Sequence, residues 1–172
     1  MYVMVDVESD GPIPGDYSMI CFGAIAVEPS LSRTFYGRTR PISDRWLPEA
    51  LAISGFTRQE TLTFDEPAEV MDAFEKWLAN LQARRLVFIS DNNGYDWGFI
   101  NWYFHHYLGR NPFGFSSQNL NSLYKGLTKN EVASFKALRR TEHTHHPVDD
   151  ARGNAEALLA MAEQHGLILG VK

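Results

Sequence analysis

The order of apolar periodicities along this chain is the feature that most restricts its fold. Three short β-branched or aromatic runs come first, at residues 2–8, 18–27 and 33–40, and turn-forming residues separate the first two. From Asp65 the apolar spacing changes to three and four, which predicts a helix with Asp65 as N-cap and Pro67 in its first turn. Strands that come first and are then separated by helices favour an α/β fold, with a mixed β-sheet flanked by α-helices.

The second half of the chain continues this alternation. A strand is expected at 85–90, an aromatic-rich helix at 95–108, a further helix at 119–127, and a last helix from near Asp149 to Gly166. Four residues of the aromatic helix are expected to share one face: Phe99, Trp102, Tyr103 and His106. No repeat, low-complexity tract or linker interrupts the pattern, so the sequence predicts a single domain over residues 1–172.

Composition and charge exclude several classes of protein. Hydrophobic residues make up 44% and charged residues 22%, which is typical of a soluble globular protein. No apolar run is long enough to cross a membrane and no signal-peptide pattern is present, so we expect a cytoplasmic protein. Cys21 is the only cysteine, which excludes an intramolecular disulfide and a thiolate zinc cluster. The net charge of −5 disfavours a grip on long duplexes, but carboxylates that hold cations remain compatible with local binding of a strand end.

A pair of carboxylates stands at the end of the first predicted strand. Asp6 and Glu8 are two residues apart, so both side chains leave the same face of the sheet. Mg²⁺ and Mn²⁺ take such oxygen ligands and leave coordination positions for water and a substrate phosphate. A polar strand end before a turn also occurs without any chemistry, so this pair alone does not identify a metal site.

Two further acids lie at the starts of predicted helices. Asp96 is in the first turn of the aromatic helix, where an acid commonly does no more than interact with the helix N-terminus. Asp150 opens the last helix, where it would serve equally well as a cap. His145 precedes Asp150 by five residues, and an imidazole beside a metal-bound water can take its proton at neutral pH. The histidine therefore favours a catalytic interpretation of Asp150.

The histidines at 143, 145 and 146 also suggest a zinc hydrolase. The familiar binuclear pattern places an aspartate two residues after the second histidine and another histidine directly behind it. Pro147 and Val148 occupy those positions in this sequence. A metal site built on the acids is therefore the favoured interpretation.

Together, three segments resemble the motifs of the DEDDh exonucleases, the family that includes oligoribonuclease, RNase T and the proofreading subunit of bacterial replicative polymerase. VDVESDG is similar to the first motif, DNNGYDWGF to the second, and HHPVDDA to the third with its five-residue separation. MICFGAIAVE resembles the strand after the first motif, and ISGFT resembles the loop that packs against the terminal nucleoside. The resemblance spans nearly the whole chain. It departs at Asp91, where relatives often have His, and at 116–118, where many carry an aspartate.

The resemblance implies an RNase-H-like domain that hydrolyses phosphodiester bonds from the 3′ end of a single strand and releases nucleoside 5′-monophosphates. It implies that Asp6, Glu8 and Asp150 hold one divalent cation and that Asp6 also reaches a second. Asp96 would complete the acidic set, and His145 would be the general base. The expected cofactors are therefore two divalent cations, Mg²⁺ or Mn²⁺, in a two-metal mechanism.

Substrate binding is expected around the motifs. Phe56, Tyr95 and Trp97 are candidates for stacking on terminal bases, although aromatic residues more often belong to the core. The resemblance implies that backbone groups of Ser9 and Gly55 approach the sugar of the terminal nucleotide, and Asn92 is a further substrate-binding candidate. Five basic residues approach the histidine segment and are candidates for contacts to upstream phosphates: Lys125, Lys129, Lys136, Arg139 and Arg140.

Several functions share these features. The chain is expected to be an exonuclease acting on 3′ ends of single-stranded RNA or DNA, with RNA favoured. The alternatives are a DNA-specific 3′ exonuclease, a catalytically idle nucleic-acid-binding module, and an RNase-H-like endonuclease. Clustered acids that repel one another argue against an idle module. Small relatives are often homodimers, so a homodimer is possible, and residues 95–108 could supply either its interface or only core.

Overall fold

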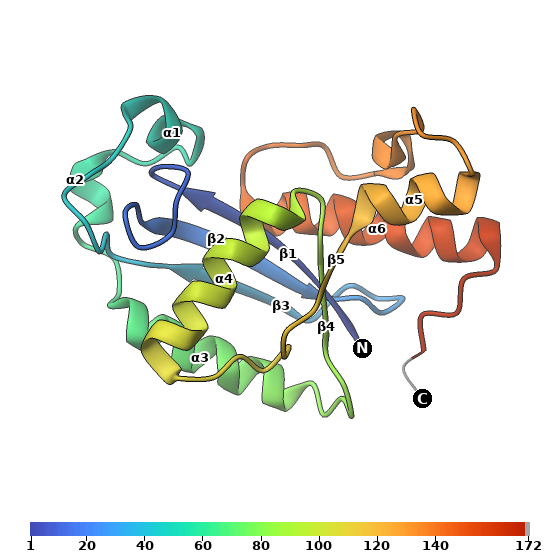
Figure 1. Ribbon diagram of the computed structural model, residues 1–172, viewed down its shortest axis with the longest axis horizontal. Coiled ribbons are helices and arrows are strands. Elements are labelled where there is room, and N and C mark those ends of the chain that lie inside the picture. Colours follow the sequence, from blue (N-terminus) through green and yellow to red (C-terminus); the bar gives the residue numbers. More distant parts are fainter. Residues whose placement is uncertain (171–172) are drawn as a thin grey trace.

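The computed structural model describes residues 1–170 and is built on a five-stranded mixed sheet (Figure 1). Its strands are β1 (Tyr2–Ser9), β2 (Met19–Ala26), β3 (Thr34–Arg38), β4 (Val87–Ser90) and β5 (Ser117–Asn119). They lie in the order β3-β2-β1-β4-β5; β1 and β2 pair antiparallel, as do β2 and β3, whereas β1 and β4 pair parallel, as do β4 and β5. The predicted mixed sheet is confirmed. The sequence prediction missed β5 because its three residues are polar and show no strand periodicity.

One face of the sheet is covered by α3 (Pro67–Asn80) and α4 (Asn93–Leu108) (Figure 1). Alternate β1 residues Val3, Val5 and Val7 point to this face, and their side chains join an aromatic core with Phe74 and Phe99. This packing explains the apolar spacing of both helices. It also means that the intervening residues of β1 point to the opposite face.

The boundaries and faces of these helices differ in detail from the predictions. The N-cap of α3 is Glu66 rather than Asp65, because Pro67, with its fixed φ and missing N–H, is already the first helical residue. On α4, Phe99 and Tyr103 are fully buried as predicted. Trp102 is half-buried and stacks on the exposed His106, so the face that these residues share runs from the core to the surface. Ile100 and Phe104 are also buried in the core, which widens the apolar face.

The other face of the sheet is covered by α5 (Leu120–Thr128), the short 3₁₀ helix η1 (Phe135–Leu138) and α6 (Pro147–His165). Met4 of β1 packs there with Ala151 and Leu158 of α6. Asp6 and Glu8 follow Met4 at two-residue intervals and therefore face α6. The alternation of side chains along β1 thus places Asp6 and Glu8 on the same side of the sheet as Asp150, the third predicted ligand.

Helix α6 begins at Pro147, earlier than the predicted start near Asp149, and ends at Gly166 as predicted, with φ of 65° at this C-cap. Its 19 residues include charged side chains at intervals along the helix. Within residues 1–170, no helix combines the length and apolar composition that a membrane crossing requires.

Two short helices, α1 (Pro48–Ile53) and α2 (Arg58–Thr61), form a lobe beside the end of β1 (Figure 1). The fully buried Asp10 joins this lobe to the sheet: its Oδ2 lies 2.8 Å from Arg58 Nη1, and its Oδ1 accepts from the Ser18 N–H at 2.6 Å. The sequence prediction missed both helices because each is shorter than two turns and carries little apolar periodicity. The lobe carries residues 54–57, which belong to the segment predicted to pack against the terminal nucleoside.

Candidate active site

Three carboxylates distant in the sequence converge at the end of β1. Asp6 and Glu8 come from the strand, and Asp150 comes from the first turn of α6, where it is fully buried. One carboxylate oxygen from each lies within 4.8 Å of the others. Three oxygen donors at this separation can share a divalent cation.

Gly23 makes this convergence sterically feasible. It pairs with Asp6 across the β1–β2 ladder, and the first turn of α6 lies directly over it. A Cβ built at Gly23 would stand 2.5 Å from the carbonyl carbon of Pro147 and from the amide nitrogen of Val148. Only glycine lets the start of α6 approach the sheet so closely, and that approach brings Asp150 to Asp6.

Gly23→Ala is therefore expected to destabilise the protein by about 1–3 kcal/mol, because the added methyl meets backbone atoms that cannot turn aside. The displaced helix start should also weaken Mn²⁺ binding. Gly98→Ala on α4 is the matched control: its Cβ would meet nothing within 4 Å, so stability should stay level or rise. Thermal unfolding and Mn²⁺ titration of both variants would test this; equal stability of the two variants would contradict the close approach.

Asp96 reaches the site from the other layer. Parallel pairing of β1 with β4 ends at Met4, and beyond it the Val7 N–H donates to Asp96 Oδ1 at 3.2 Å. Asp96 is buried, and burial raises its pKa to about 8. It lies close enough to Asp6 to raise the pKa of that carboxyl as well. The structure therefore places Asp96 next to Asp6, on the α4 side of the three converging carboxylates.

The site is an unbalanced group of like charges. Burial raises the pKa of Asp6 well above its usual range, and the neighbouring Asp96, Glu8 and Asp150 raise it further. Burial also raises the pKa of Glu8 to about 7, with a smaller contribution from Asp150. Such a cluster disfavours its own ionised form until a cation joins it. An all-oxygen donor set with excess negative charge fits Mg²⁺ or Mn²⁺.

Asp150 is held by a segment that runs from η1 to α6. Its Oδ1 accepts from Arg139 Nη2 at 3.0 Å and from the Thr144 N–H at 3.1 Å, and its Oδ2 accepts from the His145 N–H at 2.9 Å. His143 Nδ1 lies 2.8 Å from Oδ1. These four groups fix the carboxylate and shape the histidine segment around it.

His145, the predicted base, lies at the rim of the site. Its Nδ1 is 4.0 Å from Glu8 Oε1, and 52% of its side chain is exposed. Its backbone is left-handed, with φ of 62°, and its ring packs edge-on against His143 with centroids 4.4 Å apart. His143, His145 and Asp150 also offer ligand atoms within 4.8 Å of one another. Sequence reasoning noted His143 only for the zinc pattern and missed its contact with Asp150, because a pairing across a loop leaves no periodic signal.

Two of the predicted substrate-binding residues meet beside the acids. The Ser9 hydroxyl donates to the Gly11 carbonyl at 2.5 Å and forms a short hydrogen bond with the Tyr95 hydroxyl. Because the Ser9 proton is already used, Tyr95 is the donor in that bond. Burial raises the pKa of Tyr95 to about 12, and the nearby Glu8, Asp96 and Asp6 add to the shift. The pair therefore borders the carboxylates.

The other four predicted contacts are more scattered. Gly55 is exposed with φ of 75°, and the half-buried Phe56 packs edge-on against Phe64 in the α1–α2 lobe. Asn92 is exposed, and its backbone carbonyl accepts from the Asp96 N–H at 3.0 Å. Trp97 packs against Phe88 and borders the core, as many aromatic residues do. Their contacts with substrate remain predictions.

Residues 1–162 match the family described as the 3′-5′ exoribonuclease Rv2179c-like domain. The chain belongs to this family. It is also 38% identical over 168 residues to the 3′-5′ DNA exonuclease Cap18 of Escherichia coli, an alignment that covers 91% of this chain and 88% of Cap18. The predicted membership of a 3′-to-5′ exonuclease family is confirmed.

Solved structures of low sequence identity share the fold of this family member. Cell-death related nuclease 4 (CRN-4) superposes with a TM-score of 0.75 at 16% identity, over 95% of this chain and 64% of CRN-4. The zinc-bound complex of E. coli ExoI with single-stranded DNA gives 0.68 at 18%, over 95% of this chain and 40% of ExoI. S. pombe Pop2p with bound Mg²⁺ and Mn²⁺ gives 0.68 at 14%, over 96% of this chain and 84% of Pop2p. The predicted RNase-H-like fold is confirmed.

Proposed function

We propose that this chain is a metal-dependent exonuclease that releases nucleoside 5′-monophosphates from the 3′ ends of single strands. The observation that carries the proposal is the meeting of Asp6, Glu8 and Asp150 within 4.8 Å at the end of β1, in a member of a 3′-5′ exonuclease family. The proposal treats residues 1–172 as one catalytic domain that works in the cytoplasm. A homodimer through α4, whose Trp102 and His106 stack at the surface, is part of the same proposal.

Asp6, Glu8 and Asp150 would hold the cations, and Asp96, whose negative charge raises the pKa of Asp6, would complete the acidic set around them. When bound, two ions of Mg²⁺ or Mn²⁺ would supply charge stabilisation at the scissile phosphate and lower the pKa of a water molecule. The all-oxygen donor set and the raised pKa values of Asp6 and Glu8 support this assignment. Both observations describe a site whose negative charge exceeds what its own residues neutralise.

His145 would accept the proton of the attacking water. The half-exposed ring stands beside Glu8, where water can reach it from solvent. The hydrogen bond from its N–H to Asp150 keeps the backbone of the base attached to a proposed ligand. The Asp150 carboxylate would therefore position both the general base and a bound cation.

Ser9 and Tyr95, with Gly55 and Phe56 from the lobe, would receive the terminal nucleotide. Selection for RNA requires a group that binds the 2′-hydroxyl. The hydroxyl protons of Ser9 and Tyr95 are both engaged within the protein, so these two side chains would bind a 2′-hydroxyl only by accepting its proton. We propose that RNA, which the sequence favoured, and DNA, the substrate in the name of Cap18, are both hydrolysed.

The test is a degradation ladder. With Mg²⁺ or Mn²⁺, 5′-labelled single-stranded RNA and DNA of equal sequence should both shorten from the 3′ end one nucleotide at a time, at rates within about tenfold of each other. A chelator should stop the reaction. Internal cuts would identify an endonuclease instead, and metal-dependent binding without nucleotide release would identify an idle binding module. A rate ratio above about a hundredfold would overturn the shared-substrate proposal.

A further inference from the structure

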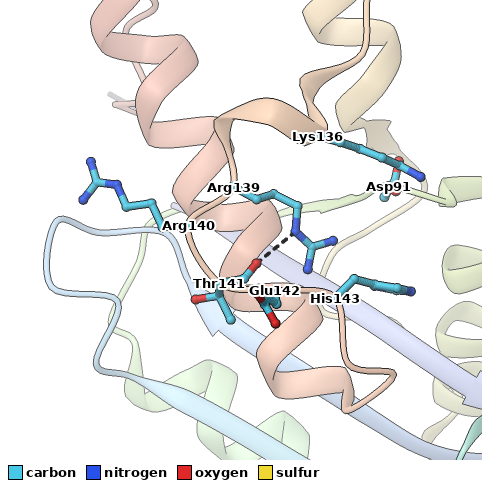
Figure 2. A pocket seen from close by; sticks show the side chains of 7 residues that line it. All are labelled: Asp91, Lys136, Arg139, Arg140, Thr141, Glu142 and His143. Carbon is cyan, nitrogen blue, oxygen red and sulfur yellow. Dashed lines mark hydrogen bonds between the residues drawn. The ribbon is translucent and has the colours of Figure 1, made fainter.

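A second feature of the active-site end is a pocket of about 300 Å³ between the η1–α6 segment and the start of α4 (Figure 2). Lys136, Arg139, Arg140 and His143 line it from one side and Asp91 from the other. Arg139 and His143 both contact Asp150, so the pocket shares a wall with the carboxylate site. Any ligand that fills it lies next to the proposed metal ligands.

The side chains of this pocket are arranged for an anion. Figure 2 shows Lys136, Arg139 and His143 extending to the same side of the segment, the side on which Asp91 lies, whereas Arg140 extends to the opposite side. Lys136 and Arg139 face the half-buried carboxylate of Asp91, Arg139 is also paired with Asp150, and Glu142 is exposed, so the pocket offers N–H donors rather than a surplus of positive charge. Burial raises the pKa of Asp91, while the neighbouring Lys136 and Arg139 oppose that rise.

Arg139 is a fixed part of the pocket wall. Only 9% of its side chain is exposed, and its guanidinium lies over Gly153, where an added Cβ would stand 2.4 Å from Nε. Its Nε–H donates to the Thr141 carbonyl at 3.4 Å and its Nη2 to Asp150. A guanidinium has five N–H groups, so three remain for another acceptor. An immobilised guanidinium is well suited to a phosphate oxygen.

The position of the pocket relates it to the path of a strand. The α1–α2 lobe lies on one side of the end of β1, and the η1–α6 segment, drawn in orange, lies on the other (Figure 1). Ser9, Tyr95 and the lobe would receive the terminal nucleotide on the first side. The remainder of the strand would then leave past the carboxylates on the second side, where the pocket is.

We propose that Lys136, Arg139 and His143 form a binding site for the backbone phosphate immediately upstream of the scissile one. This inference rests on the proposed function, because an upstream phosphate exists only if a strand end enters the carboxylate site. On this proposal, the pocket makes the enzyme prefer a nucleic-acid strand, which has an upstream phosphate, over an ester of a single nucleotide, which has none. Lys136 is the residue to test because, unlike Arg139 and His143, it does not contact Asp150.

Two substrates separate this site from the catalytic one. A single-stranded oligonucleotide has an upstream phosphate, whereas the 4-nitrophenyl ester of thymidine 5′-monophosphate has one phosphate and releases nitrophenolate. Lys136→Gln should lower kcat/KM for the oligonucleotide about 5- to 10-fold at low salt, mainly through KM, and reduce its logarithmic salt slope by about 0.7. The ratio of oligonucleotide to ester activity should fall by the same factor.

Arg140 was also a sequence candidate for upstream phosphates and borders the pocket, but its side chain extends to the opposite side (Figure 2), so Arg140→Gln removes the same charge without removing a pocket donor and is the matched control. Its activity ratio should stay within about twofold of the wild-type ratio. An unchanged ratio in Lys136→Gln, or an equal fall in Arg140→Gln, would overturn the assignment while leaving nuclease activity intact. Hydrolysis of neither substrate by the wild type would instead overturn the proposed function.

Measuring binding without turnover tests the proposed phosphate site whether or not the protein hydrolyses either substrate. Fluorescence anisotropy of a labelled oligonucleotide, with Ca²⁺ in place of Mg²⁺, requires no hydrolysis. Lys136→Gln should weaken this binding about 5- to 10-fold, and Arg140→Gln should not. Equal affinity of Lys136→Gln and the wild type would exclude the pocket as a phosphate site.

Discussion

Asp6→Asn is expected to lower the rate of nucleotide release by at least about a thousandfold and, at the same time, to stabilise the metal-free protein. The loss of activity follows from the central position of Asp6, whose oxygen lies within reach of both Glu8 and Asp150. An amide cannot supply the charge that a shared divalent cation needs, and the cations carry most of the transition-state stabilisation.

The gain in stability follows from the sign of the pKa shift. Burial and three neighbouring acids raise the pKa of Asp6, so the folded protein binds this proton more tightly than the unfolded chain does. The free energy of unfolding of the metal-free protein therefore falls as the pH rises above the ordinary carboxyl range. Asn removes that repulsion, and at pH 8 in chelator the variant should gain about 1–2 kcal/mol, or roughly 2–8 °C in Tm.

Asp10→Asn is the control for this experiment. Asp10 is fully buried, and burial raises its pKa too, but it pairs with Arg58 at 2.8 Å rather than facing other acids. Its replacement should destabilise the protein by about 1–3 kcal/mol, because Arg58 loses its partner. Calorimetry with and without Mn²⁺ would measure both variants. A metal-free Asp6→Asn protein that melts below the wild type at pH 8 would show that the acids do not repel one another as described.

The sequence was sufficient to predict the parts of the site that strand and helix periodicity control. A period of two residues places Asp6 and Glu8 on one face, and the apolar pattern of α6 brings Asp150 to that same face. The mixed sheet followed from the same reasoning. The Asp65 cap was wrong because proline at position 67 outweighed a cap preference.

Contacts that depend on irregular backbone could not be predicted in this way. Arg139 and His143 reach Asp150 from a segment with no periodicity, and their convergence depends on left-handed φ at His145 and on the space above Gly153. The requirement for glycine at 23 is equally hidden, since it comes from a helix more than a hundred residues away. These features arise from tertiary packing, and only coordinates reveal them.

His145→Asn and His143→Asn should distinguish the base from its neighbour. Asn tolerates the left-handed backbone at position 145 and keeps the N–H that bonds to Asp150, but it cannot accept the proton of water. His145→Asn should therefore lower kcat about 10²- to 10⁴-fold with little change in Mn²⁺ affinity.

His143→Asn should have the opposite pattern. Its Nδ1 lies 2.8 Å from Asp150, so its loss should weaken Mn²⁺ binding. Its ring does not approach Glu8 as that of His145 does, so kcat should fall less than about tenfold. Single-turnover rates at saturating Mn²⁺, with Mn²⁺ titrations of both variants, would separate the two effects. If His143→Asn gave the larger loss in kcat, the role of general base would have to be reassigned from His145 to His143.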